Sequence, residues 1–259
     1  MLYSPPEMML IVFAAGLCIG SFLNVCIYRI PESKSIVTPP SSCPSCGYRI
    51  RYYDNIPIAS YLFLRGKCRQ CHARISLRYP MVELLTGLFA LWVFFRLGLS
   101  LQALVYFAFI ATLLVITFID IDHRIIPDVI SLPGIPVFFL ASFAVPSLTY
   151  KESLMGILLG GGILYAVAWT YLFLTKREGM GGGDIKLLAM MGGLIGWKGV
   201  FFTIFVSSAI GTVTGLAIMI ATRKNMKLAV PFGPFLAMGA VIYIFFGQEM
   251  ILWYFRLMR

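Results

Sequence analysis

Long apolar runs separated by polar segments dominate the chain. Most of the runs are unbroken and carry charges only at their ends, and an α-helix needs roughly 20 such residues to cross a bilayer. The pattern therefore predicts an all-α polytopic membrane protein with about eight transmembrane helices. These helices are expected at residues 8–28, 81–97, 101–119, 129–146, 154–174, 185–197, 200–221 and 229–254.

Two of these runs differ from an ordinary crossing. Residues 129–146 contain Pro133, Gly134 and Pro136, so this helix should bend, and its freed backbone groups need partners inside the bundle. Residues 185–197 are too few for a full upright crossing. This segment is either a tilted, partly submerged span or one arm of a re-entrant hairpin.

The composition agrees with a membrane location. Hydrophobic residues make up 59% of the chain and charged residues 12%, against about 25% charged residues in soluble domains. A cleavable signal peptide is not expected, because no Lys or Arg precedes the first apolar run and no small-residue cleavage site follows it. We therefore interpret residues 8–28 as a retained first span.

One long polar insertion, residues 29–80, carries most of the net charge of +10. Because basic loops stay on the cytoplasmic side, this loop is predicted to be cytoplasmic and the N-terminus to lie outside. The same rule does not fix the side of the C-terminus. We interpret this charge as a signal that sets the topology, and we expect the basic residues to contact anionic lipid as well. We expect no nucleic-acid binding, because the sequence shows no soluble domain that could recognise a nucleic acid. The basic residues are Arg29, Lys34, Arg49, Arg51, Arg65, Lys67, Arg69, Arg74 and Arg78.

The insertion contains two C-x-x-C pairs, Cys43 with Cys46 and Cys68 with Cys71. Each pair can present two thiolates to one tetrahedral ion, and four sulfurs close a structural zinc site with no open position for chemistry. The alternative is two disulfides, which a reducing cytoplasm disfavours. His72, beside Cys71, is a less favoured alternative ligand. The spacing therefore predicts a structural Zn²⁺ site.

Ionisable residues at the ends of apolar runs are the candidates for chemistry, because charge near the bilayer interior is costly. Asp120 directly follows residues 101–119, and Asp184 directly precedes residues 185–197, on the same side in this topology. Two carboxylates that meet there can share one proton, leaving one as general base and the other as general acid. The alternative is helix capping, with Asp184 as an N-cap.

Glycines precede the second aspartate in the order Gly181-Gly182-Gly183-Asp184. Such a segment lets the backbone approach a substrate closely or adopt a positive φ. The alternatives are a helix cap or a phosphate-binding loop. No Gly-Lys-Ser/Thr ending follows, so the pattern does not indicate a P-loop.

Several segments in a fixed order together resemble the bacterial type IV prepilin peptidases. The resemblance covers about residues 10–235, nearly the whole chain, and several motifs in order are more specific than any one of them. The matching segments are GSFLNVCIYRIP at 20–31, the two C-x-x-C pairs, ISLRYPMVE at 75–83, residues 120–128 and the G-x-G-D at 181–184.

This resemblance implies an activity. Members of the family are G-x-G-D aspartyl enzymes of the bacterial cytoplasmic (inner) membrane. They remove the basic leader of type IV prepilins or type II secretion pseudopilins, and then N-methylate the new N-terminal residue with S-adenosylmethionine. The resemblance therefore implies a bifunctional enzyme with pilin-like substrates; it names neither the client nor the oligomeric state.

The resemblance also implies residue roles. Asp120 and Asp184 would form the catalytic pair, and Gly181 and Gly183 would belong to the active-site loop. Asp122 would tune this pair or bind the leader. Lys186 would contact substrate or place its charge at the membrane interface, and Asp128 would cap the fourth span.

The implied domain organisation has three segments: residues 1–28 as the first span, 29–80 as the cytoplasmic zinc-binding loop, and 81–259 as the transmembrane aspartyl peptidase domain. No Rossmann-type glycine motif marks a pocket for the methyl donor. Asn24, Glu83 and the polar loop are candidates by position alone. Asn24 alternatively makes an interhelical hydrogen bond.

Two other functions share some of these features. A transporter would also carry intramembrane carboxylates and broken helices, but it usually shows two similar halves, and none is found here. A relative with peptidase activity only would lack methyl transfer, and such relatives usually lack the cysteine insertion. The sequence therefore favours the bifunctional enzyme.

Overall fold

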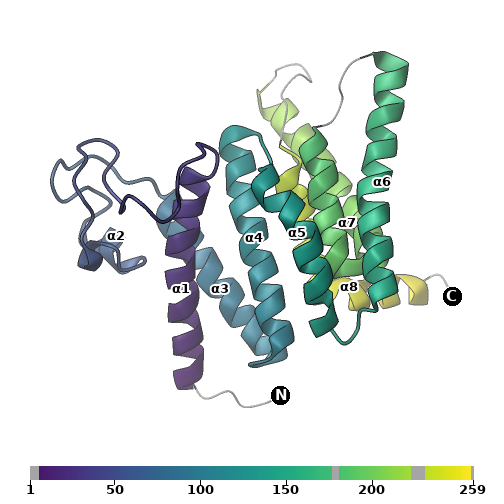
Figure 1. Ribbon diagram of the computed structural model, residues 1–259, viewed down its shortest axis with the longest axis horizontal. Coiled ribbons are helices and arrows are strands. Elements are labelled where there is room, and N and C mark those ends of the chain that lie inside the picture. The colour runs from purple at the N-terminus through teal and green to yellow at the C-terminus, as the bar shows by residue number, and fades with distance from the viewer. Residues whose placement is uncertain (1–5, 177–180, 223–230, 258–259) are drawn as a thin grey trace. The chain divides into compact units, whose positions relative to one another are not determined.

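A computed structural model describes residues 6–176, 181–222 and 231–257. Throughout these residues the regular elements are helices (Figure 1), which confirms the predicted all-α class. The predicted span 229–254 begins at two residues outside the described ones. The elements are α1 Pro6–Arg29, η1 Tyr52–Asp54, α2 Ala59–Phe63, α3 Arg78–Leu97, α4 Leu101–His123, α5 Asp128–Ala141, η2 Ser142–Ala144, α6 Tyr150–Thr175, α7 Gly182–Thr222 and α8 Gly233–Leu257.

Six of the described helices, α1, α3, α4, α6, α7 and α8, are long and apolar enough to cross a membrane. The helix α5, which contains Pro133 and Pro136, is apolar but shorter. The long helix α7 is interrupted at Gly196, whose φ of 66° and ψ of 178° are not helical. The predicted runs 185–197 and 200–221 are therefore two helical arms joined at a break. The chain is a multi-pass membrane protein, and the path of the short arm through the membrane stays a prediction.

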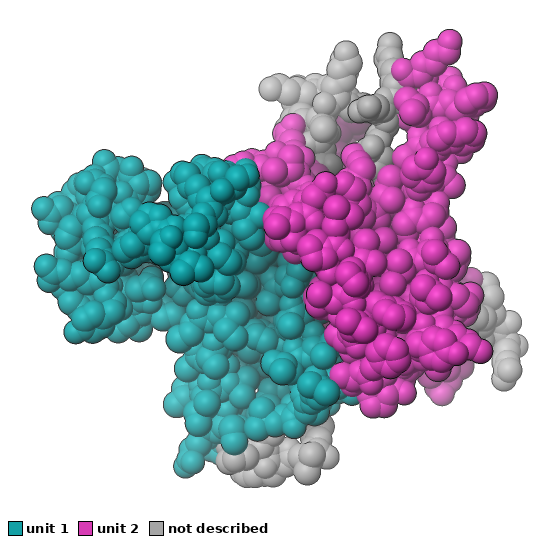
Figure 2. Space-filling view, viewed as in Figure 1, with its two compact units in different colours: residues 1–115 teal, residues 116–259 magenta. Residues whose placement is uncertain are grey.

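The chain forms two compact units, Met1–Val115 and Ile116–Arg259, shown in different colours in Figure 2. The boundary falls inside α4. The division into residues 1–28, 29–80 and 81–259 was drawn from polarity along the chain and stays a prediction.

In the first unit, α1 packs against α3 through glycines. A Cβ atom at Gly20 would lie 2.7 Å from the Cα of Glu83, so only glycine permits this approach. One turn further along α1, the buried Asn24 donates from Nδ2 to the backbone oxygen of Tyr79 at 3.0 Å. The interhelical hydrogen bond expected for Asn24 is thus confirmed, and the close packing brings Asn24 near the start of α3.

In the second unit, α5, α6 and α8 all pack against α7. Thr149 and Glu152 form a capping box that begins α6. Glycines then allow α6 to approach the backbone of α7, where a Cβ atom at Gly160 would lie 2.5 Å from the oxygen of Leu188. Nearby, the buried Ser153 hydroxyl donates to the oxygen of Gly193 at 2.5 Å. This packing fixes the short arm of α7, which begins at the candidate site.

Gly160→Ala should destabilise the protein, because the new methyl group meets backbone that cannot rotate away. Overpacking of this kind costs about 1–3 kcal/mol. Gly162→Ala is the matched control, since a Cβ atom there meets nothing within 4 Å. The thermal unfolding midpoint in detergent should fall for Gly160→Ala and stay the same or rise for Gly162→Ala. Equal midpoints for the two variants would contradict the close helix contact.

Candidate active site and metal centre

The first aspartate lies near the end of α4. Asp120 is only 5% exposed. Its backbone oxygen accepts a hydrogen bond from Arg124 at 2.9 Å, and Arg124 adopts a φ of 57° that ends the helix. The chain then turns towards Pro127, which begins the next helix as its N-cap. The carboxyl of Asp120 is therefore held on a buried helix end instead of a free loop.

The second aspartate lies in the first turn of α7. Asp184 is partly buried, and its N–H donates to the backbone oxygen of Gly181 at 3.3 Å. The carboxyls of Asp184 and Asp120 are close enough to interact directly through their like charges. The structure thus brings together the two aspartates that the sequence singled out, although 64 residues separate them.

The two glycines of the Gly-x-Gly-Asp segment differ in their surroundings. A Cβ atom at Gly183 would lie 2.9 Å from the Cβ of Ile126, in the segment that joins α4 to α5. A Cβ atom at Gly181 meets nothing within 4 Å. Gly183 therefore permits close contact between the two segments that carry the aspartates, whereas Gly181 leaves open space beside Asp184.

The remaining charged candidates lie on the exposed side of the site. Asp122 is exposed. Lys186 donates from Nζ to both carboxylate oxygens of Asp128 at 2.8 Å. Pro127 is the N-cap of α5, so Asp128 lies in the first turn of that helix and is not its N-cap, contrary to the prediction. The carboxylate of Asp128 pairs with Lys186 instead. This ion pair joins the start of α5 to the start of α7.

Sequence reasoning missed one residue of this site, Gly233. Its backbone N–H, at the start of α8, donates to Oδ2 of Asp120 at 3.0 Å. A Cβ atom at Gly233 would lie 2.6 Å from the same oxygen. The signal was the Pro231-Phe232-Gly233-Pro234 segment at the start of the last apolar run, where prolines and a glycine mark a specialised turn.

In the first unit, the two C-x-x-C pairs form two hairpins of the same construction. In each hairpin, the backbone N–H of the first cysteine donates to the backbone oxygen of the residue five positions later. The backbone oxygen of the same cysteine accepts from the N–H of the residue four positions later. The residue at the fourth position has a positive φ, which is 72° for Gly47 and 57° for His72. His72 therefore occupies the turn position of its hairpin, and the cluster of ligand atoms found among the described residues consists of the four cysteines.

The geometry of this cluster fits a tetrahedral ion. The four sulfurs lie within 4.8 Å of one another, and the Sγ atoms of Cys43 and Cys71 are 3.8 Å apart. Four thiolates about 2.3 Å from a zinc ion would be separated by about 3.8 Å. The cluster could therefore hold a metal ion without rearrangement of the hairpins.

The thiols also have the electrostatics of a metal site. Partial desolvation raises the pKa of Cys43, but hydrogen bonds from the N–H groups of Cys46 and Ser45 and from neighbouring thiols lower it to about 6. The N–H of Tyr48 lowers the pKa of Cys46, but desolvation and adjacent thiols raise it to about 12. The lowered pKa of Cys43 favours its thiolate, which is the form that binds a metal ion.

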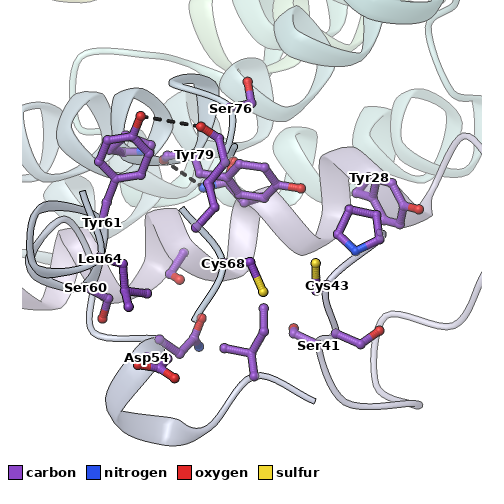
Figure 3. Close-up of a pocket in the computed structure, with 18 of the residues that line it drawn as sticks. Tyr28, Ser41, Cys43, Asp54, Ser60, Tyr61, Leu64, Cys68, Ser76 and Tyr79 are labelled. Atoms are coloured by element: carbon purple, nitrogen blue, oxygen red, sulfur yellow. Dashed lines mark hydrogen bonds between the residues drawn. The ribbon is translucent and has the colours of Figure 1, made fainter. Parts of the chain in front are cut away.

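The hairpins form one wall of a cavity of about 550 Å³ in the first unit. Figure 3 shows Cys43, Cys68, Tyr61 and Tyr79 among the residues that line this cavity. The ends of α1 and α3 contribute Asn24 and Glu83, so these two candidates and the polar loop border a single space. A volume of this size is typical of small-molecule sites.

Two protein-family models match consecutive parts of the chain. Residues 14–97 match the model of the bacterial peptidase A24 N-terminal domain, and residues 107–216 match that of the type IV leader peptidase family. The prepilin leader peptidase/N-methyltransferase of Pseudomonas putida is 36% identical over 90% of this chain and 89% of its own length. The protein of that name from Pseudomonas aeruginosa is 35% identical over 95% of this chain and 92% of its own length. No solved structure matches the chain.

The fold and these matches define the class: a multi-pass membrane enzyme with an N-terminal A24 domain ahead of a peptidase domain. The chain belongs to the type IV leader peptidase family. The family resemblance stated from the sequence is thus confirmed.

The cysteine cluster should bind one metal ion per chain. Replacement of Cys43, Cys46, Cys68 or Cys71 with Ser should weaken binding of the ion so that it is lost on dialysis against a chelator, because the site loses one of its four thiolate ligands. Cys18→Ser is the matched control, since this exposed cysteine lies on α1 outside the cluster. Elemental analysis of the purified protein gives the stoichiometry, and limited proteolysis should show residues 43–71 cleaved faster in the metal-free variants. Metal-free wild-type protein with disulfides under reducing conditions would contradict the site.

Proposed function

We propose that this chain is a prepilin leader peptidase and N-methyltransferase of the bacterial inner membrane. It removes the leader peptide of type IV prepilins and then methylates the new N-terminus. The observation that carries the peptidase assignment is the proximity of Asp120 and Asp184 at the ends of two apolar helices. Relatives that carry this name are 32–36% identical over most of the chain and support both activities.

The two carboxyls have different surroundings, and these suggest their roles. Asp120 is buried and accepts the N–H of Gly233 at the start of α8, where helix geometry favours a negative charge. In our proposal Asp120 is the general base: it takes a proton from water as the oxygen attacks the scissile carbonyl carbon. Asp184, partly buried, is the general acid that protonates the leaving amine. Gly181 leaves space for the substrate backbone, and Gly183 lets its segment pack against Ile126.

The charged neighbours act on the rim of this site. Asp122, which is exposed, tunes the pair or receives the basic leader. Lys186 is held by Asp128, so its charge offsets a carboxylate beside the catalytic pair. These roles follow from position, because Asp122 is exposed and Lys186 pairs with Asp128 instead of either aspartate of the catalytic pair.

The proposed orientation places the N-terminus outside and residues 29–80 in the cytoplasm, because that loop carries most of the net positive charge. The two aspartates then lie at the cytoplasmic interface. A pilin precursor has an apolar helix preceded by a basic leader, so its scissile bond would reach the same level. Type II secretion pseudopilins have the same chemistry and are the alternative client.

Zinc is the proposed ion of the cysteine cluster, because four thiolates with tetrahedral spacing are typical of structural zinc sites. A four-cysteine ion has no open position, so its role is to fold the loop. The cavity that the hairpins border is the proposed site of S-adenosylmethionine, which supplies a methyl group carried on a sulfonium. Asn24, Glu83 and the loop would bind this donor. A peptidase without methyl transfer would leave both the cluster and the cavity unexplained.

Asp120→Asn and Asp184→Asn should each abolish leader cleavage and leave the protein inserted in the membrane. Asp122→Asn and Asp128→Asn should retain activity, because neither residue is in the buried pair. Cleavage of a prepilin peptide, followed by mass spectrometry, measures the effect. With one carboxylate ionised and one protonated, activity should fall on both sides of an optimum pH. Efficient cleavage by either of the first two variants would exclude the aspartyl mechanism.

Gly233→Ala gives an independent test of the same pair. The added methyl group would lie 2.6 Å from Oδ2 of Asp120 and should displace this carboxyl, so cleavage should fall strongly. Gly215→Ala is the matched control, because a Cβ atom there meets nothing within 4 Å. Equal activities in the two variants would mean that Asp120 need not be held in this position.

Disruption of the cysteine cluster should impair methylation more than cleavage. The cluster borders the proposed donor cavity, whereas Asp120 and Asp184 belong to the other compact unit. Cys68→Ser should therefore lose the added methyl group on a pilin substrate while much leader removal remains. Asp184→Asn should block methylation of the precursor and not of pre-cut pilin. A proportional loss of both activities in a folded Cys68→Ser protein would contradict this division.

A further inference from the structure

The end of the cavity formed by α1 and α3 contains two buried hydrogen-bond acceptors. Asn24 is 4% exposed and Glu83 is 8% exposed, and both border the cavity. They come from helices that glycine packing holds in contact, so their positions are fixed by backbone. Buried acceptors of this kind need donors, and here the protein supplies them only in part.

The side-chain oxygen of Asn24 has no partner among the described residues. Its Nδ2 donates to the backbone oxygens of Gly20, at 3.3 Å, and Tyr79, at 3.0 Å, so the amide orientation is fixed by two acceptors. Oδ1 is left buried without a donor. An unsatisfied buried acceptor is costly, and a donor from a ligand would remove this cost.

The carboxylate of Glu83 is held in place from one side. Its Oε2 accepts the N–H of Ile58 at 2.7 Å, and Ser21 also hydrogen-bonds the side chain. Ile58 has a φ of 59°, which is rare for a β-branched residue. The insertion thus adopts an uncommon backbone conformation where it meets Glu83.

Two other charged groups of the cavity wall bind within the protein, and the wall also includes Arg74 and Arg78. Asp54 binds Arg69 through both carboxylate oxygens. Arg29 donates to the backbone oxygens of Ser35 and Pro39. Asn24 and Glu83 are buried acceptors of this wall, and an amide oxygen together with a carboxylate is suited to a group with several N–H donors and a positive charge.

We propose that Asn24 and Glu83 bind a primary ammonium group, the amino group at the amino-acid end of the methyl donor. This inference rests on the proposed function, which places that donor in the cavity. The cavity volume suits a nucleoside-sized ligand. The aromatic rings of Tyr28, Tyr48, Tyr61 and Tyr79 on its wall offer surfaces for an adenine. The new N-terminus of a cleaved pilin is also a primary ammonium group. The experiment therefore distinguishes it from the amino group of the methyl donor.

The experiment compares two probes that share the adenosine part. S-Adenosylhomocysteine carries the amino-acid end, and methylthioadenosine lacks it. Binding of each to the purified full-length protein is measured by calorimetry, and cleavage of a prepilin peptide reports folding. Glu83→Gln keeps an acceptor for Ile58 and removes the negative charge. Glu32→Gln, an exposed carboxylate of the same unit that pairs with Lys34, is the matched control.

Loss of a charge-assisted hydrogen bond should weaken binding of S-adenosylhomocysteine by about tenfold to a hundredfold in Glu83→Gln. Methylthioadenosine should bind this variant as it binds wild type, and Glu32→Gln should change neither probe. Equal weakening of both probes would overturn the proposal, because Glu83 would then only shape the cavity. If Glu83→Gln binds both probes as wild type does but has a raised KM for pre-cut pilin, the site binds the peptide amine. That result would also overturn the proposal.

A further variant separates this proposal from the proposed function. Val25→Trp places a large side chain on the cavity wall and should weaken both probes. If it weakens neither, the methyl donor binds elsewhere, and the proposed location of methyl transfer fails together with this inference. If Val25→Trp weakens binding of both probes while Glu83→Gln weakens binding of neither, the methyl donor still binds in the cavity. Only the role of Glu83 is then overturned.

Discussion

The hydrogen bond from Gly233 to Asp120 shows the constraint on which the candidate active site depends. Lipid offers no hydrogen bonds, so a carboxyl at the end of an apolar helix must find its donors within the protein. Here the donor is the backbone amide at the start of α8, 113 residues further along the chain. A glycine is needed at that position because a side chain would collide with the carboxylate it serves.

The same constraint explains the glycines elsewhere in the bundles. Apolar side chains gain little from packing against each other inside lipid, so helices associate best where small residues let backbones approach. Gly20 does this for α1 and α3, and Gly160 does it for α6 and α7. These contacts bury polar groups such as Asn24 and Ser153, whose hydrogen bonds then join neighbouring helices. The helices that carry the candidate sites are therefore fixed by backbone contact.

The cysteine cluster solves a different problem. The insertion between α1 and α3 contains little regular structure, with only a short 3₁₀ turn and the short helix α2. It has few buried apolar residues, and a metal ion held by the four cysteines would replace that missing core. Asp54 and Arg69 add an ion pair between the 3₁₀ turn and the second hairpin. In the proposed function, a bound ion and the cavity beside it would be parts of one structure.

The sequence by itself determined the features that depend on local spacing. The length of the apolar runs predicted the helices, and the two C-x-x-C pairs predicted the four-cysteine cluster. The order of the motifs predicted the family. The candidate aspartates also came from the sequence, because an ionisable residue at the end of an apolar run is conspicuous. Their roles remain part of the proposed function.

Tertiary structure decided what depends on contacts between distant segments. The role of Gly233, the pairing of Lys186 with Asp128, and the turn position of His72 are set by backbone geometry or by partners that no local pattern names. The cavity is the clearest case. Asn24 and Glu83 were candidates by position alone, and only the packing of α1 on α3 brought them to one space with the loop. Spacing along a chain predicts which groups are available, whereas the packing of helices decides which of them meet.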